Sequence, residues 1–184
     1  MISDLEFSDG LVLIRPYRLD DADAIYEAVR ESIPDLLPWV SWCHTYYSID
    51  EAKFFLKAQA EWWKEGSVYN FAITDAEGGG FLGGCVLNRI DRTNRFANLS
   101  YWVRSSRTRQ GVASAASLLA ARFGFEELGL NRIEIVAATS NVASLRVAEK
   151  LSATREGILR NRITVRDKIY DAVMFSLIPE DLES

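Results

Sequence analysis

The chain has 184 residues, 48% of them hydrophobic and 26% charged, which fits one globular domain (residues 1–184, with a core at about 11–178). Its net charge of −5 argues against general nucleic-acid binding, because phosphate contacts need clustered Lys and Arg, and it is compatible with a cationic substrate such as an amine. No apolar run reaches the ~18 residues of a membrane span, and two cysteines without CxxC spacing or a signal peptide favour a reducing cytoplasm.

A strand, a helix and an apolar loop are predicted near the N-terminus. Residues 11–15 favour a strand, which a proline then ends. A helix is predicted from Leu19 to about Arg30, where Asp20 or Asp21 can cap the free amides. Two prolines then interrupt the chain around residues 36–42, and an apolar loop of this kind can cover a core or line a groove.

The next segment predicts a second helix and three strands. Ser48 and Glu51 have the capping-box spacing and open a helix that runs to about Lys64. A glycine-rich turn at residues 78–80 predicts a hairpin. The predicted strands are 68–74, 81–88 and 97–103.

The helix from Val112 to Leu128 is the clearest element, because its apolar residues recur at helical spacing and Gly129 can end it. A strand at 132–137, a short helix from about Asn141 to Leu151 and strands at 154–163 and 167–177 complete the chain. The order describes one α/β domain with a mixed sheet of about seven strands and about four helices.

A basic turn of small residues, Thr108–Ala113, opens the long helix. The unpaired N–H groups and the dipole of a helix N-terminus favour an anion. Gly111 would let the chain approach a phosphate closely, and Arg107 and Arg109 would add positive charge. The alternative is that Gly111 merely starts the helix and the arginines are solvated.

Five short segments in this order and spacing resemble the GCN5-related N-acetyltransferases (GNAT), in particular the RimJ/RimL-like branch that acetylates the N-termini of ribosomal proteins. The resemblance extends from about Leu11 to Leu177 and implies a sheet split between its fourth and fifth strands, acetyl-CoA as the co-substrate, and no metal. The matching segments are Leu37-Pro38-Trp39, Tyr101-Trp102-Val103, Gln110-Gly111-Val112-Ala113, Asn141-Val142-Ala143-Ser144 and Tyr170-Asp171.

The resemblance also implies where coenzyme A is held. The family's pyrophosphate loop falls on Thr108–Ala113, with Thr where the family has Gln or Arg, a departure that a loop working through backbone amides would tolerate. The implied cofactor contacts are Trp102, Val103, Arg109, Gln110, Gly111, Val112, Ala113, Ser114 and Asn141. Alternatively, Trp102 and Val103 only belong to a buried strand, and Asn141 only caps its helix.

In the ribosomal branch, a Ser at the position of Ser144 is proposed to protonate the thiolate of coenzyme A. Many relatives use a Tyr seven residues after the Asn, but that position is Ala148 here, which favours Ser144 as the catalytic residue. The alternative is that Ser144 only supports the start of its helix.

The general base cannot be identified from the sequence. An α-amino group with a pKa near ~8 is partly neutral at cellular pH, so a strong base is less necessary than it is for a lysine. A related enzyme type has a Glu where Ile163 stands, and a base acting through ordered water is a further option. Candidates by charge alone are Asp35, Asp91, Glu156 and Asp171.

The aromatic segment from Trp39 to Tyr47, with Trp62 and Trp63, is predicted to border the acceptor, and Trp39 is the substrate-binding candidate. The alternative is that these residues only cover the core. A catalytic pair of Cys43 and His44 is disfavoured because no third orienting group is evident.

The function expected first is acetyl transfer from acetyl-CoA to the N-terminal amine of a protein, with a ribosomal protein as the first candidate. Acetylation of a small amine, such as an antibiotic, polyamine or amino-acid conjugate, is the alternative, since a fold does not determine the acceptor. A coenzyme A sensor without activity is a third option. A Rossmann protein is disfavoured because no G-x-G-x-x-G follows the first strand. The pattern leaves open whether the protein is a monomer or a homodimer.

Overall fold

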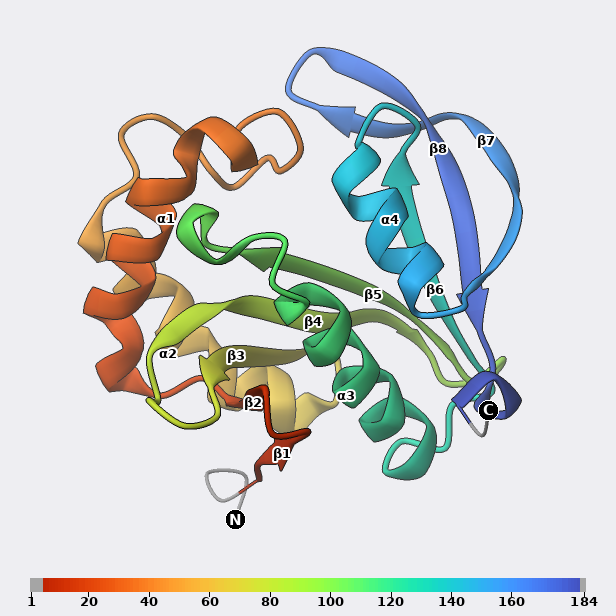
Figure 1. The fold of residues 1–184 in the computed structure, drawn as a ribbon, viewed down its shortest axis with the longest axis horizontal. Helices are drawn as coiled ribbons and strands as arrows, with labels where there is room; N and C mark the ends of the chain where they lie inside the picture. The colour runs from red at the N-terminus through yellow and green to blue at the C-terminus, as the bar shows by residue number, and fades with distance from the viewer. Residues whose placement is uncertain (1–4, 183–184) are drawn as a thin grey trace.

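Figure 1 shows the computed structural model, which describes residues 5–182. A single eight-stranded sheet has the order β1-β2-β3-β4-β5-β6-β8-β7. The strands are β1 (Phe7–Ser8), β2 (Val12–Pro16), β3 (Tyr69–Asp75), β4 (Phe81–Asp91), β5 (Phe96–Val103), β6 (Arg132–Ala138), β7 (Thr154–Val165) and β8 (Lys168–Leu177). The α-helices are α1 (Ala22–Leu36), α2 (Ile49–Glu65), α3 (Val112–Glu126) and α4 (Val142–Lys150).

The mixed α/β architecture with four α-helices is confirmed, but the sheet has eight strands rather than about seven. The additional strand is β1, a two-residue edge segment that pairs with Leu13 and Ile14 of β2. So short a strand carries too little of the alternating pattern to be recognised from sequence.

The sheet splits between β5 and β6. These two strands are parallel neighbours, and they pair only where Phe96–Asn98 lies beside Arg132–Glu134. Beyond Asn98 the strands diverge, while β6 continues along β8 and β5 continues along β4. The C-terminal half of β5 therefore has backbone groups on its β6 side that no strand takes up.

Alternation along the strands divides the core into two layers. In β3, Phe71 and Ile73 pack in the larger cluster, which includes α3, whereas Ala72 between them packs with α1 and α2. Figure 1 accordingly shows α3 in front of the sheet and α2 behind it. The two faces of β5 thus look into different layers.

Two details of the first helix differ from the prediction. The helix continues through Pro34 to Leu36 instead of ending near Arg30. Pro34 removes one helical hydrogen bond, and burial of Leu36 against α2 offsets this loss. Asp21 does not cap the helix with its side chain. Its carboxylate instead binds Arg15, at 2.7 and 2.8 Å, and the Arg18 backbone N–H.

The capping box predicted for the second helix is confirmed, because Ser48 and Glu51 form it at the start of α2. The predicted end of the long helix is two residues late, because α3 ends at Glu126 with Glu127 as its C-cap. Gly129 has a left-handed φ of 63° in the turn that follows. Across residues 5–182, no helix has both the length and the apolar character required to cross a membrane.

Candidate active site

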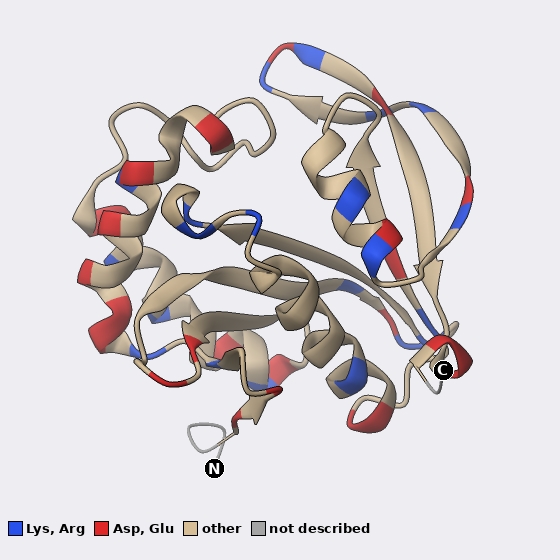
Figure 2. Cartoon of the chain, viewed as in Figure 1, with Lys and Arg blue, Asp and Glu red and all other residues tan. Residues whose placement is uncertain are grey.

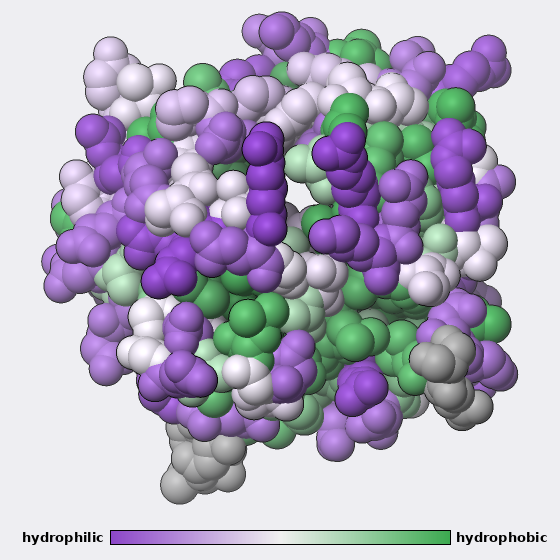
Figure 3. Space-filling view, viewed as in Figure 1, coloured by the Kyte–Doolittle hydropathy of each residue, from purple (hydrophilic) through white to green (hydrophobic). Residues whose placement is uncertain are grey.

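A cleft of about 860 Å³ occupies the split in the sheet. Its walls come from β5, β6, the start of α3, α4 and the loop after α1, and Figure 3 shows an opening in this region of the surface. Ten of the eleven residues predicted for the site line the cleft: Trp39, Trp102, Val103, Arg109, Gly111, Val112, Ala113, Ser114, Asn141 and Ser144. The exception is Gln110, whose exposed side chain donates to the Ser106 carbonyl.

The start of α3 presents free backbone amides to this cleft. Gly111 is the N-cap, with a φ of 84° that favours glycine, and no side chain caps the helix. A Cβ at Gly111 would meet only Leu11, at 3.6 Å, so the backbone conformation and not the available space requires glycine. The Ser114 hydroxyl donates to the Gly111 carbonyl and leaves the first N–H groups open.

Four cationic side chains line the same cleft. Arg107 and Arg109 come from the loop before α3, and Arg146 and Lys150 come from α4. Figure 2 shows basic residues on both of these segments, which face each other across the gap. Together with the helix N-terminus, they make this the cleft's electropositive end, although the chain as a whole is acidic. Arg146 and Lys150 were not predicted, because their helical spacing has meaning only once α4 faces α3.

A hydroxyl pair lies where α4 meets β5. The Tyr101 hydroxyl is 3.1 Å from Ser144 Oγ and donates to the Ser144 carbonyl at 3.0 Å. Burial raises the pKa of Tyr101 to about 12, so the phenol remains protonated at neutral pH. The side chain of Asn141 accepts from the Ser144 N–H and caps α4, the role predicted as its alternative. From the sequence, Tyr101 belongs to a segment that matches the family but is not a predicted site residue.

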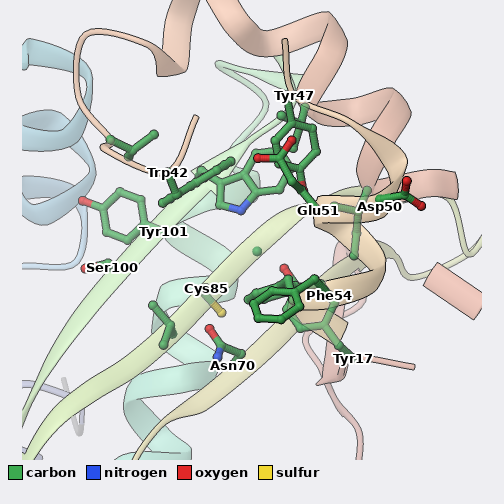
Figure 4. Close-up of a pocket in the computed structure, with 17 residues that line it drawn as sticks. Tyr17, Trp42, Tyr47, Asp50, Glu51, Phe54, Asn70, Cys85, Ser100 and Tyr101 are labelled. Atoms are coloured by element: carbon green, nitrogen blue, oxygen red, sulfur yellow. The ribbon is translucent and has the colours of Figure 1, made fainter. Parts of the chain in front are cut away.

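A second cavity, of about 570 Å³, lies over the α1/α2 side of β3, β4 and β5. Figure 4 shows Tyr17, Trp42, Tyr47 and Phe54 around it. Both cavities are lined by residues 100–102 of β5, so they meet beside the split.

The predicted aromatic wall is divided between three places. Trp42 and Tyr47 line the second cavity, whereas Trp39 lines the first and contacts Tyr170 with 6.1 Å between the ring centroids. Trp63 packs in the core against Phe71, and Trp62 contacts the ring of Phe55. Only part of this segment therefore lies where an acceptor could be held.

Of the four carboxylates considered as a base, only Asp35 lines either cavity. The other three have local partners: Asp91 binds Asn94, Glu156 binds Arg132 and Ser176, and Asp171 accepts from the Asn161 N–H. The structure thus places those three outside the two cavities.

Glu51 and Asp50 contribute carboxylates to the second cavity. The Tyr46 N–H donates to His44 Nδ1, which leaves the proton of a neutral ring on Nε2 to donate to Glu51 at 2.7 Å. This hydrogen bond lowers the pKa of Glu51, so its carboxylate is ionised at neutral pH. Among the described residues, no hydrogen bond joins His44 to the buried Cys43 thiol.

A split mixed sheet with an open helix N-terminus at the split defines an acyl-transferring α/β protein. The model of the acetyltransferase (GNAT) domain matches residues 12–154. The chain belongs to the GNAT family of N-acetyltransferases, whose acetyl donor is acetyl-CoA.

Individual relatives agree with this assignment. The uncharacterized N-acetyltransferase p20 of Bacillus licheniformis is 27% identical over 168 residues, which cover 91% of this chain and 93% of that protein. A Vibrio cholerae protein, provisionally named a ribosomal-protein-serine acetyltransferase, is 29% identical with a TM-score of 0.84, covering 97% of this chain and 100% of its own. Mycobacterium smegmatis RimJ, solved with a CoA-disulfide, is 26% identical with a TM-score of 0.82, covering 95% and 85%.

Proposed function

We propose that the protein transfers the acetyl group of acetyl-CoA to the N-terminal α-amine of a protein. The observation that carries this proposal is the meeting of two cavities at residues 100–102 of β5. One cavity offers backbone amides and cations to a phosphorylated donor, and the other offers aromatic and acidic groups to an amine.

On the donor side, the amides of Gly111 to Ala113 bind the pyrophosphate, and Arg109 adds charge at the same end of the cleft. The unpaired backbone of β5 near Trp102 and Val103 binds the amide groups of the pantetheine arm. Arg146 and Lys150 lie where they can neutralise the remaining phosphate charge. These contacts direct the thioester toward Ser100–Trp102.

The reaction is a direct attack of the neutral amine on the thioester carbonyl. A C–N bond forms, the C–S bond breaks, and the amine proton passes to water or to a base acting through water. Ser144 gives a proton to the leaving thiolate and takes one back from water, while Tyr101, which is hydrogen-bonded to Ser144, holds the Ser144 hydroxyl in place. The protein contributes chiefly by aligning the two reactants.

A ribosomal protein is the first candidate for the acceptor, supported by the name of the Vibrio cholerae relative. Such an acceptor would place the protein in the cytoplasm. A small amine is the second candidate, because a cavity of about 570 Å³ also suits a small molecule.

Release of free thiol from acetyl-CoA, followed across a panel of peptides and small amines, tests the proposal. We expect turnover with peptides that have a free α-amine and none with the same peptides after N-terminal blocking. Tight binding of coenzyme A without turnover of any amine would contradict the proposal and favour a coenzyme A sensor without activity. Turnover confined to non-peptide amines would support the second candidate.

A further inference from the structure

The second cavity is much larger than a small N-terminal side chain requires. Its volume of about 570 Å³ lies within the range of roughly 300–1,000 Å³ typical of sites for drug-sized molecules. A serine contributes only a hydroxymethyl group beside its α-amine. An acceptor with such a small side chain would leave most of the cavity filled with water.

Aromatic rings form the walls of this cavity. The ring centroids of Trp42 and Trp102 are 5.8 Å apart, and those of Tyr17 and Phe55 are 5.1 Å apart. Near the mouth, Trp42 is 44% exposed and Phe54 is 78% exposed, and Figure 4 shows both side chains at the cavity. Large apolar surfaces that remain in water beside this cavity would be covered by an apolar ligand.

A glycine at the floor of the cavity makes room for two aromatic rings. A Cβ at Gly84 would lie 2.1 Å from the Tyr17 hydroxyl and 3.0 Å from Trp102 Nε1. Any larger residue would therefore displace the two rings that define the floor. Within the described part of the chain, the Tyr17 hydroxyl has no hydrogen-bond partner, and burial raises its pKa well above the usual value. The floor thus presents a neutral hydroxyl and no charge.

Charge is confined to the mouth and has one sign. Glu51 and Asp50 line the cavity, and the described lining residues include no Lys or Arg. Carboxylates there attract the ammonium form that an amine has in solution, and the exposed aromatic faces favour the same cation. Farther in, apolar surroundings disfavour the ammonium and favour the neutral nucleophile. This arrangement partly compensates for the lack of an evident base.

We propose that the acceptor is a primary amine carried by a large apolar group, which fills the second cavity while the amine lies at Ser100–Trp102. The proposal rests on the proposed function and specifies the substrate class of the same site. The apolar group can be the side chain of an N-terminal Phe or Leu, or the body of a free amine such as 2-phenylethylamine. The acceptor class thus differs from the serine in the Vibrio cholerae relative's provisional name.

The test compares tetrapeptides that differ only in their first residue, Phe, Leu, Ala or Ser, together with 2-phenylethylamine as the free amine. We expect kcat/KM for the Phe and Leu peptides to exceed that for the Ala and Ser peptides at least ~10-fold. Turnover of 2-phenylethylamine but not of the peptides would identify a small amine as the source of the apolar group. Equal turnover of all four peptides, or a preference for Ala or Ser, would overturn the proposal.

A variant that fills the second cavity tests whether this cavity causes the preference for the Phe peptide. Val86 lines only the second cavity, so Val86→Phe should bring the ratio between the Phe and Ala peptides close to one. The matched control is Ile158→Phe, at an exposed position of β7 that lines neither cavity, and it should keep the wild-type ratio. Retained acetyl-CoA binding shows that the Val86 variant is folded. An unchanged ratio in a folded Val86→Phe variant would contradict the proposal.

Calorimetry of peptide binding separates this inference from the proposed function. If no amine is turned over but the Phe peptide still binds at least ~10-fold tighter than the Ala peptide, the proposed reaction fails and the cavity's specificity stands. If the Ala and Ser peptides are turned over best, the reaction stands and the specificity fails.

Discussion

At the residue scale, Gly111 is the most specific test of the donor site. Gly111→Asp places a carboxylate among the amides that are proposed to bind the pyrophosphate. The Kd for acetyl-CoA in calorimetry should rise by roughly 10-fold or more, about 1.4 kcal/mol, because the new charge both repels phosphate and competes for the amides.

The matched control for this change is Gly129→Asp. Gly129 also has a left-handed φ and lies beyond the opposite end of α3, with nothing within 4 Å of its added Cβ. Both variants therefore carry a similar backbone cost, and only the first should lose acetyl-CoA. Similar affinities for the two variants would mean that the phosphates bind elsewhere.

The hydroxyl pair provides the second prediction at this scale. Ser144→Ala and Tyr101→Phe should each lower kcat at least ~10-fold, while the Kd for acetyl-CoA changes less than ~3-fold, since the hydrogen-bonded hydroxyl pair is proposed to protonate the leaving thiolate. Steady-state kinetics and calorimetry on the same samples check this separation. A Ser144→Ala enzyme with full turnover removes Ser144 from the mechanism.

Most of the residues predicted for the donor site line the cleft, and the features that mark them in the sequence are local. Gly111 and Ser144 each belong to a short motif at a helix start. Tyr101, Arg146 and Lys150 could not be assigned in this way, because their roles depend on how α4 lies against β5 and α3. A periodic pattern shows which face of a helix is polar but not what that face opposes.

At the element scale, the β7–β8 hairpin is tied to the loop between α1 and α2. Arg166 donates to the Leu37 and Cys43 carbonyls, and Figure 1 shows the hairpin reaching toward this loop. The loop carries Trp39 and Trp42, which line the two cavities. Arg166 is therefore positioned to hold the loop over the place where the cavities meet.

Arg166→Ala should release this loop. Loss of charge-assisted hydrogen bonds should lower the protection of backbone amides in residues 38–45 against hydrogen exchange by roughly 10-fold, and the KM for the amine should rise. Arg160→Ala, an exposed change on β7 of the same hairpin, is the control. Unchanged exchange in the Arg166 variant would show that other contacts hold the loop.

The extent of α1 shows where element boundaries could not be predicted. A proline two residues before the helix end reads as a stop signal, yet the chain remains helical to Leu36. The continuation is stabilised by tertiary contacts: Leu36 is buried with α2, and the Ser32 hydroxyl accepts from the Ser105 N–H. Such contacts come from residues far along the chain, so local propensity cannot predict them.

At the scale of the whole molecule, the free energy of unfolding should decrease as the pH falls into the acidic range. Arg104 holds the pKa of Glu31 at about 2, and Arg132 holds that of Glu156 at about 2, below the ordinary 4.5. The unfolded chain therefore binds more protons than the folded one between these values. The stabilisation is present above about pH 4.5 and is lost as the pH falls through 2.

Urea denaturation from about pH 5 to about pH 2.5 measures this effect. The denaturation midpoint of the wild type should fall across the range, and that of a Glu31→Gln, Glu156→Gln double variant should fall less. Glu149→Gln, at an exposed position of α4 without an ion pair among the described residues, should behave as the wild type. If the denaturation midpoints of all three proteins fell equally with pH, Glu31 and Glu156 would not be the source of the effect.

The architecture could be predicted from the sequence, whereas the second cavity could not. Long periodic segments and the order of elements defined the fold, because each carries its own signal. The second cavity is assembled from Tyr17, α1, the loop around Trp42, the start of α2 and parts of β3, β4 and β5. No spacing in the sequence predicts that these segments surround one space, so the acceptor class is proposed only from the structure.

A crystal structure with coenzyme A bound tests the proposed donor site most directly. We expect the pyrophosphate within hydrogen-bond distance of the amides of Gly111 to Ala113, and the thiol beside Tyr101 and Ser144, where the cleft meets the second cavity. A coenzyme A molecule whose pyrophosphate lies away from the start of α3, or whose thiol does not reach that junction, would contradict the proposed donor site.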